Sequence, residues 1–221
     1  MKLYSMIGSG NSYKVRLLLS KLGLPYVHVA MSSRDGSTRT PEFLAINPIG
    51  KLPVLELDDG HHLAESNAIL LYLAELHHTE PTCYLPRMPY ERALVFQWLF
   101  FEQYSHEPNV AVRRALLTYP ERAARATPER LAQTLAGGNH ALGVMEQQLA
   151  RTPYLVGDCL TVADISLYAY THDADVGGFD LNGFPAVRRW LDRVAAEPGH
   201  VPMMDPRLLE APEVFMPGRA E

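Results

Sequence analysis

The sequence predicts a two-domain protein, with an α/β domain followed by an all-helical domain. Strand and helix patterns alternate over the first third of the 221 residues. Near residue 80 they give way to HHTEPTCYLPRMP, a proline-containing stretch without periodicity that indicates a linker. Beyond it, apolar residues recur at helical spacing and no stretch is convincing as a strand. We therefore expect an α/β domain over residues 1–80, an all-helical domain over 87–205 and a tail over 206–221.

The elements of the first domain follow from local patterns. Four short strands are indicated by alternation or by β-branched residues, in the segments KLYSMI, YVHVAM, KLPVLEL and HLAES. Leucines at helical spacing predict a helix over SYKVRLLLSKLGL, which ends at Gly23. A second helix is expected over SNAILLYLAELH, capped by Ser66. The order β-α-β, loop, β-β-α favours an α/β sandwich with a small mixed sheet.

Start signals mark the helices of the second domain. An apolar helix is expected over YERALVFQWLFFEQYS. Thr127 as N-cap and Pro128 at the first helical position predict the beginning of another. Thr161 and Asp164 have the spacing of a capping box, and Pro185 stands near the start of a last helix. These signals predict an all-helical bundle.

Composition and charge narrow the possible functions. The net charge of -5 argues against a nucleic-acid-binding protein, which usually carries a basic excess. Cys83 and Cys159 are far apart and no CxxC occurs, so neither a disulfide scaffold nor a paired-cysteine zinc site is indicated. The histidines show no metal-binding spacing. Because there is neither a signal peptide nor an apolar run of ~18 residues, we expect a cytoplasmic protein with no metal, membrane or nucleic-acid partner.

Three polar stretches carry the chemistry: SGNSYKVR from Ser9, NPIGKLPVL from Asn47 and AESNAIL from Ala64. The combination of NPxGKxP with a downstream Glu-Ser pair is specific, although either alone is weak. With these stretches the chain resembles the serine-type cytosolic glutathione transferases over nearly its whole length. The resemblance implies a thioredoxin-like first domain, glutathione as co-substrate and a homodimer in contact through the helices that start at Tyr90.

The resemblance also assigns the residues that would bind glutathione. Pro53 would follow a cis peptide bond, so that the backbone of Leu52 pairs with the cysteinyl part of the tripeptide. Lys51 would neutralise the glycine carboxylate. At the helix start, Ser66 would bind the γ-glutamyl carboxylate and Glu65 the amino group. The alternatives are a strand-edge turn for the proline and a plain helix cap for the serine.

The turn at the start of the first helix holds hydrogen-bond donors but no cysteine. Glutathione reacts as a thiolate, and lowering a thiol pKa by about two requires about 2.7 kcal/mol of preference for the anion. Hydrogen bonds and a helix N-terminus can supply this preference. In the family, members with a cysteine here act as reductases, whereas serine-type members stabilise the thiolate. Ser9 is the first expected donor, Asn11 the second and Ser12 the third, with helix capping as the other role for Ser12.

A tyrosine provides the thiolate donor in some classes of the family. That tyrosine would match Ser5 rather than Tyr4, and neighbouring strand residues point to opposite faces. We therefore do not assign this role to Tyr4.

Four residues of the segment FFEQYSHEPNVAVRR are candidates for the electrophile pocket: Phe101, Tyr104, His106 and Asn109. The alternative is that this aromatic stripe belongs to the core. The resemblance implies conjugation of glutathione to a small hydrophobic electrophile, as in detoxification. Two alternatives stay open: another glutathione-dependent enzyme on this scaffold (an isomerase, dehalogenase or β-etherase), or a non-catalytic glutathione-binding module.

Overall fold

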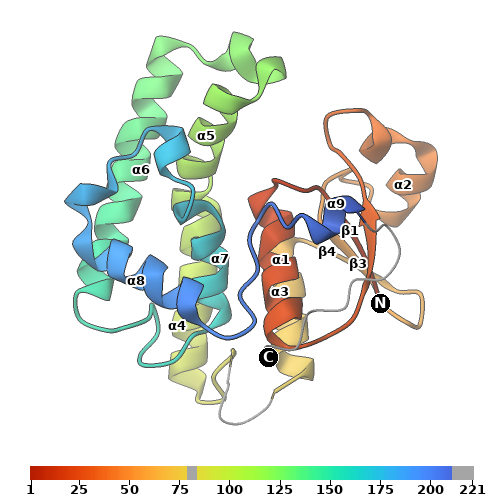
Figure 1. Cartoon of the computed structure of the whole chain (residues 1–221), viewed down its shortest axis with the longest axis horizontal. Helices are drawn as coiled ribbons and strands as arrows, with labels where there is room; N and C mark the ends of the chain where they lie inside the picture. Colours follow the sequence, from red (N-terminus) through yellow and green to blue (C-terminus); the bar gives the residue numbers. More distant parts are fainter. Residues whose placement is uncertain (79–83, 211–221) are drawn as a thin grey trace. The chain divides into compact units, whose positions relative to one another are not determined.

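The computed structural model describes residues 1–78 and 84–210. The described residues form two compact units, one from residues 1–77 and 197–210, the other from residue 78 and residues 84–196 (Figure 1). The linker residues 79–83, and the part of the expected tail beyond Glu210, lie outside the described residues.

The first unit is built on a four-stranded sheet with the order β2-β1-β3-β4. β1 pairs in parallel with β2 and antiparallel with β3, and β3 pairs antiparallel with β4. The sheet is therefore mixed, and the four predicted strands are confirmed. Their bounds are β1 Lys2–Ser5, β2 Val27–Ala30, β3 Val54–Glu56 and β4 His62–Ala64.

Two predicted helices of this unit are confirmed, and others were not predicted. α1 (Gly10–Lys21) and α3 (Ser66–Leu76) match the leucine-rich patterns, and the two helices contact each other. α2 (Pro41–Ile46) lies in a stretch that showed no helical periodicity, because six residues are too few to show one. It carries the same Thr-Pro start signal as the longest helix of the second unit. The short elements η1 (Ser37–Arg39) and α9 (Arg207–Glu210) complete the unit.

The second unit is helical, and its described residues include no strand. The predicted start signals at Thr127, Asp164 and Pro185 are confirmed. The helix predicted from Tyr90 begins at Pro89 and continues through a π-helical turn. The bounds are α4 Pro89–Phe101, η2 Glu102–His106, α5 Val110–Thr118, η3 Pro120–Arg125, α6 Pro128–Leu149, α7 Val162–Thr171, η4 Asp175–Gly177, η5 Leu181–Gly183 and α8 Pro185–Ala196.

A buried carboxylate joins three segments of the second unit. Asp164 is fully buried and accepts hydrogen bonds from the backbone N–H groups of Leu155 and Thr161, both at 2.9 Å. It also accepts from the Thr161 hydroxyl at 3.0 Å and from the indole N–H of Trp190 at 2.9 Å. The capping box thus also ties α7 to the preceding loop and to α8.

The C-terminal segment packs on the first unit, which differs from the expected division. The sequence patterns assigned residues up to 205 to the helical domain, but the structure groups residues 197–210 with residues 1–77. The reason is a set of hydrogen bonds from α1, including one from the Tyr13 hydroxyl to the carbonyl of Val201 at 2.7 Å. In Figure 1 the dark-blue segment lies beside the red α1.

Removing the Asp164 carboxylate should destabilise the second unit. In Asp164→Ala, four buried donor groups lose their acceptor, and we expect the free energy of unfolding to fall by about 3 kcal/mol or more. Urea denaturation followed by circular dichroism measures this. The control is Asp158→Ala, which removes an exposed aspartate nearby and should change stability little. Equal stabilities of the two variants would contradict the assigned role.

Candidate active site

Strand pairing brings the three sequence motifs to one edge of the sheet. In the ladder, Val54 of β3 lies between Tyr4 of β1 and Ala64 of β4. One residue further along, the same edge carries the end of β1, then Pro53, then Glu65. The N-termini of α1 and α3 follow directly from this edge. Their positive dipole ends and unpaired N–H groups therefore belong to the same region.

The turn before α1 presents two polar side chains and hides a third. Ser9 is the N-cap, and its Oγ accepts from the backbone N–H of Ser12 at 3.4 Å. That bond uses an oxygen lone pair, so the hydroxyl proton of Ser9 can still be donated. Ser12 is fully buried, and its Oγ accepts from the backbone N–H of Met6 at 3.1 Å. Ser9 and Asn11 are partly exposed, whereas Ser12 holds the turn together.

A hydrogen bond links the starts of the two helices. The Ser66 hydroxyl donates to Oδ1 of Asn11 at 3.2 Å. The bond orients the amide of Asn11, whose NH₂ group is the donor end. Ser66 was predicted to be the cap of its helix, but the structure makes Glu65 the N-cap and Ser66 the first helical residue. The reason is that Ser66 turns its side chain toward α1 instead of capping its own helix.

Asn47 shapes the loop that precedes β3. Its side chain is buried, its Nδ2 donates to the carbonyl of Lys51 at 2.9 Å, and its Oδ1 accepts from the N–H of Ile49 at 3.2 Å. Leu52 and Pro53 follow with a cis peptide bond between them, as the resemblance implied. The Lys51 side chain is exposed. The loop thus places the backbone of Leu52 and the cationic side chain of Lys51 at this edge of the sheet.

Arg39 is a second cation at this loop, and sequence reasoning missed it. Its Nη1 donates to the carbonyl of Ile49 at 3.1 Å. A Cβ on Gly50 would lie 2.5 Å from the same nitrogen, and Gly50 has a positive φ of 64°. The position therefore requires glycine. An isolated arginine in a stretch without periodicity gives no sequence signal, because only the fold brings it to the loop.

Glu65 has a strained backbone. Its φ of 67° is the only positive value among the described non-glycine residues. Such a conformation costs on the order of 1–3 kcal/mol, and strain of this kind clusters at functional sites. The side chain is exposed and makes no capping bond. As the N-cap of α3, Glu65 accepts at its backbone carbonyl from the N–H of Ile69 at 3.0 Å, and its carboxylate stays at the surface.

Tyr4 is unsuited to activate a thiol. Its hydroxyl donates to Oε2 of Glu56 at 2.6 Å. Burial, and then the hydrogen bond to Glu56, raise the pKa of Tyr4 to about 12. The phenol thus stays protonated at neutral pH and its proton is engaged by a carboxylate.

The four residues predicted for the electrophile pocket lie in different surroundings in the second unit. His106 is fully buried and its Nε2 lies 3.0 Å from the hydroxyl of Thr171. The amide of Asn109 donates to a backbone carbonyl one turn earlier. Phe101 lines a hollow of about 280 Å³, and Tyr104 is 88% exposed. His106 thus contributes to helix packing, whereas Phe101 and Asn109 are partly exposed and Tyr104 is exposed.

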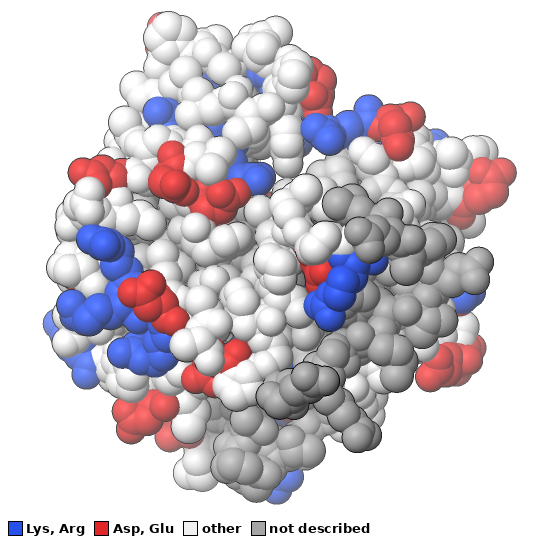
Figure 2. Space-filling view, viewed as in Figure 1, with Lys and Arg blue, Asp and Glu red and all other residues white. Residues whose placement is uncertain are grey.

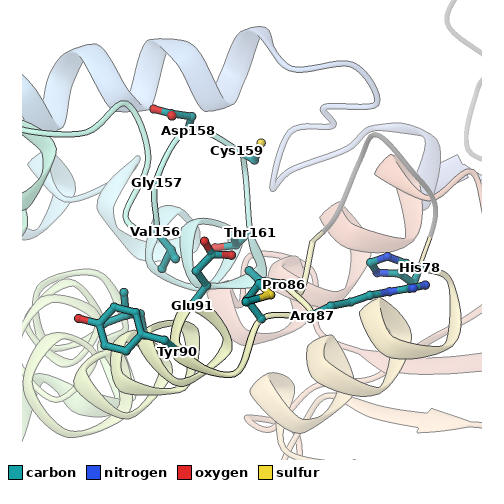
Figure 3. A pocket seen from close by; sticks show the side chains of 12 residues that line it. His78, Pro86, Arg87, Tyr90, Glu91, Val156, Gly157, Asp158, Cys159 and Thr161 are labelled. Carbon is teal, nitrogen blue, oxygen red and sulfur yellow. The ribbon is translucent and has the colours of Figure 1, made fainter.

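A larger hollow of the second unit is separate from the predicted site. It has a volume of about 590 Å³ and lies between α4 and the loop before α7. Figure 3 shows the Glu91 carboxylate pointing into it, with Asp158 and Cys159 across from it. Cys159 is exposed with a free thiol, and Cys83 lies outside the described residues. None of the residues predicted to bind glutathione lines this hollow.

Residues 1–78 and 84–210 are the part of the chain that the structure covers. In that part of the chain, no group of three or more His, Cys, Asp or Glu side chains could hold a metal ion. None of its helices has the length and apolar character to span a bilayer. On the face in Figure 2, the acidic and basic side chains of the described residues are interspersed.

Comparison with known protein families agrees with this geometry. Residues 1–75 match the family "Glutathione S-transferase, N-terminal domain", and residues 128–193 match "Glutathione S-transferase, C-terminal domain". The chain belongs to the glutathione S-transferase family. The sheet of the first unit is thus that of a thioredoxin-like domain, as predicted.

Curated relatives of this glutathione S-transferase family member differ in their named activities. Glutathione S-transferase 3 of Zea mays is 34% identical over 208 residues, which cover 90% of each chain. The disulfide-bond oxidoreductase YfcG of Escherichia coli is 28% identical over 194 residues, 85% of this chain and 87% of the relative. Family membership is therefore shared by proteins named for different chemistry.

Solved structures of the family include complexes with glutathione derivatives. A glutathione S-transferase from Pseudomonas fluorescens is 50% identical, with a TM-score of 0.86 over 92% of this chain and 98% of the other. Ure2p in complex with S-hexylglutathione is 26% identical, with a TM-score of 0.81 over 90% of this chain and 95% of the other. Together with the family, these structures support glutathione binding.

The surroundings of Tyr4 predict that its hydroxyl is dispensable for binding. Tyr4→Phe removes the bond to Glu56, and we expect a loss of about 1 kcal/mol in unfolding free energy. Glutathione affinity, measured by calorimetric titration, should stay within twofold of the unaltered protein. A loss of glutathione binding in a folded Tyr4→Phe protein would contradict this assignment.

Proposed function

We propose that this protein is a glutathione transferase that holds glutathione as its thiolate and adds it to a small hydrophobic electrophile. One observation carries the proposal. Ser9 and Asn11 are partly exposed polar side chains at the N-terminus of α1, beside the sheet edge that bears Pro53 and Glu65. This turn contains hydrogen-bond donors and the positive end of a helix dipole, which both favour an anion.

The same edge offers a partner for each part of glutathione. The backbone of Leu52, turned by the cis bond to Pro53, would pair with the cysteinyl residue as an added strand does. Lys51 would attract the glycine carboxylate. The N-terminus of α3 with the Ser66 hydroxyl would hold the γ-glutamyl carboxylate, and the exposed Glu65 carboxylate the amino group.

The chemistry then follows from the state of the sulfur. Glutathione loses its thiol proton to solvent, and the thiolate is stabilised by the Ser9 hydroxyl and the Asn11 amide. The sulfur attacks the electrophilic carbon, a carbon–sulfur bond forms, and the leaving group departs with the bonding electrons. Ser12 keeps its place in the turn through its bond to Met6 and takes no part in this step.

The second candidate function is disulfide reduction, which the relative named as a disulfide-bond oxidoreductase favours. The turn of this chain contains no cysteine. A mixed disulfide between glutathione and the protein at this position therefore has no partner sulfur. Conjugation needs only the thiolate, and we place it first. An isomerase, a dehalogenase, a β-etherase and a binding module remain the alternatives on the same glutathione site.

The proposal extends to assembly and location. We infer a cytoplasmic homodimer, with contact through α4. Large apolar side chains on this helix and the turn that continues it are exposed: Tyr90 at 75%, Phe100 at 73% and Tyr104 at 88%. A two-fold dimer would remove such exposed apolar side chains from water.

The ultraviolet absorption of bound glutathione, titrated over pH, tests the proposal. We expect a thiolate band whose apparent pKa lies about two below that of free glutathione. Ser9→Ala and Asn11→Ala should each raise that pKa, and the larger rise identifies the main donor. The control is Ser105→Ala, which removes a partly exposed serine of the second unit.

Each outcome of this titration has a distinct meaning. A shifted thiolate band that both variants leave unchanged would contradict the roles of Ser9 and Asn11. Binding without a thiolate band would leave a binding module. In a separate turnover assay, reduction of a glutathione mixed disulfide without any conjugation would favour the oxidoreductase.

The strain at Glu65 gives a second prediction. Glu65→Gly relieves the strained φ, whereas Glu65→Ala keeps it, and both remove the carboxylate. We expect both variants to bind glutathione more weakly. Glu65→Gly should be the more stable of the two by about 1 kcal/mol, the reverse of the usual order of the two residues. Thermal unfolding measures this, and a more stable alanine variant would contradict the account.

A further inference from the structure

The C-terminal segment is fastened to α1 by buried side chains. The Tyr13 hydroxyl donates to the carbonyl of Val201 at 2.7 Å, and Nη2 of Arg16 donates to the carbonyl of Met203 at 2.9 Å. Both donor side chains are buried: Tyr13 is 0% and Arg16 1% exposed. These two hydrogen bonds therefore fix the backbone of Val201 and Met203 against α1.

A second anchor follows Met204 directly. Asp205 is 2% exposed, and its carboxylate accepts from the Arg207 guanidinium at 3.0 and 2.7 Å. These hydrogen bonds, with the positive charges of Arg207 and Arg16, hold the pKa of Asp205 below its usual range although burial opposes this. Because Met203 and Asp205 are both held by hydrogen bonds, the backbone of Met204 between them is held in place as well.

The side chain of Met204 lies against the turn that carries Ser9. A Cβ built on Gly8 would lie 3.4 Å from the Met204 sulfur, an ordinary van der Waals contact. Met204 is nevertheless 57% exposed, while the neighbouring Met203 is 7% exposed. An exposed apolar side chain therefore lies beside Gly8, the residue that directly precedes the proposed thiolate donor Ser9.

We propose that Met204 contacts the electrophile and selects for aromatic electrophiles, an inference that rests on the proposed thiolate at Ser9 and Asn11. A molecule that receives the sulfur must approach this turn, and Met204 offers it apolar surface. A thioether is flexible and polarisable, and it makes favourable contacts with aromatic rings. An aromatic electrophile would gain this contact, whereas a one-carbon electrophile is too small to use it.

Equilibrium binding to Met204→Ala tests the proposal without relying on turnover. The two ligands are glutathione and its dinitrophenyl conjugate, the product of chlorodinitrobenzene. We expect the affinity for the conjugate to fall about tenfold, as for other lost apolar contacts, with the glutathione affinity unchanged. Met204→Leu should restore most of the loss. The control is Met88→Ala, since Met88 is 64% exposed in the second unit.

Steady-state kinetics complete the test. In Met204→Ala, kcat/KM should fall about tenfold for chlorodinitrobenzene and less than twofold for iodomethane. Equal losses for both electrophiles, or unchanged affinity for the conjugate, would overturn the role of Met204. Failure of the proposed function is seen separately in the unaltered protein, as the absence of a thiolate band or of glutathione binding.

Discussion

The first unit depends on the burial of α1 from Ser12 to Ser20. All side chains from Ser12 to Ser20 are buried, including Lys14 and Arg16. α3 contacts this helix, and the C-terminal segment is bound to it through Tyr13 and Arg16. A buried guanidinium is costly without partners, so the carbonyl of Met203 and the charge of Asp205 are required for α1 to stay where it is. The position of the turn before α1 is therefore set by residues at both ends of the chain.

Strand pairing in the sheet brings the start of α1 next to the other two sequence motifs. Pairing of β1, β3 and β4 brings the turn before α1, the Asn47 loop and the start of α3 to one edge. The hydrogen bond between Ser66 and Asn11 ties two of these together. The region combines helix N-termini, an exposed lysine and a strained glutamate. The helix N-termini and the lysine favour anionic groups, which agrees with the family to which the chain belongs.

Local patterns predicted most of the fold. Strands, α1, α3 and the capped helices of the second unit follow from periodicity and start signals, because these act within a few residues. The packing of the C-terminal segment on α1 could not be predicted, because the residues that bond to each other are far apart in the sequence. Tyr13 and Val201, for example, are separated by 188 positions. The predicted glutathione residues gather at one edge, and their roles remain predictions. Arg39, the φ of Glu65 and the contact of Met204 depend on tertiary structure, which leaves no sequence pattern.

The central claim is that the α1 turn holds the glutathione sulfur. A crystal structure of the protein with glutathione tests it most directly. The account predicts the sulfur within hydrogen-bonding distance of the Ser9 hydroxyl or the Asn11 amide, with the γ-glutamyl carboxylate at the N-terminus of α3. Glutathione bound with its sulfur directed away from both side chains would contradict it.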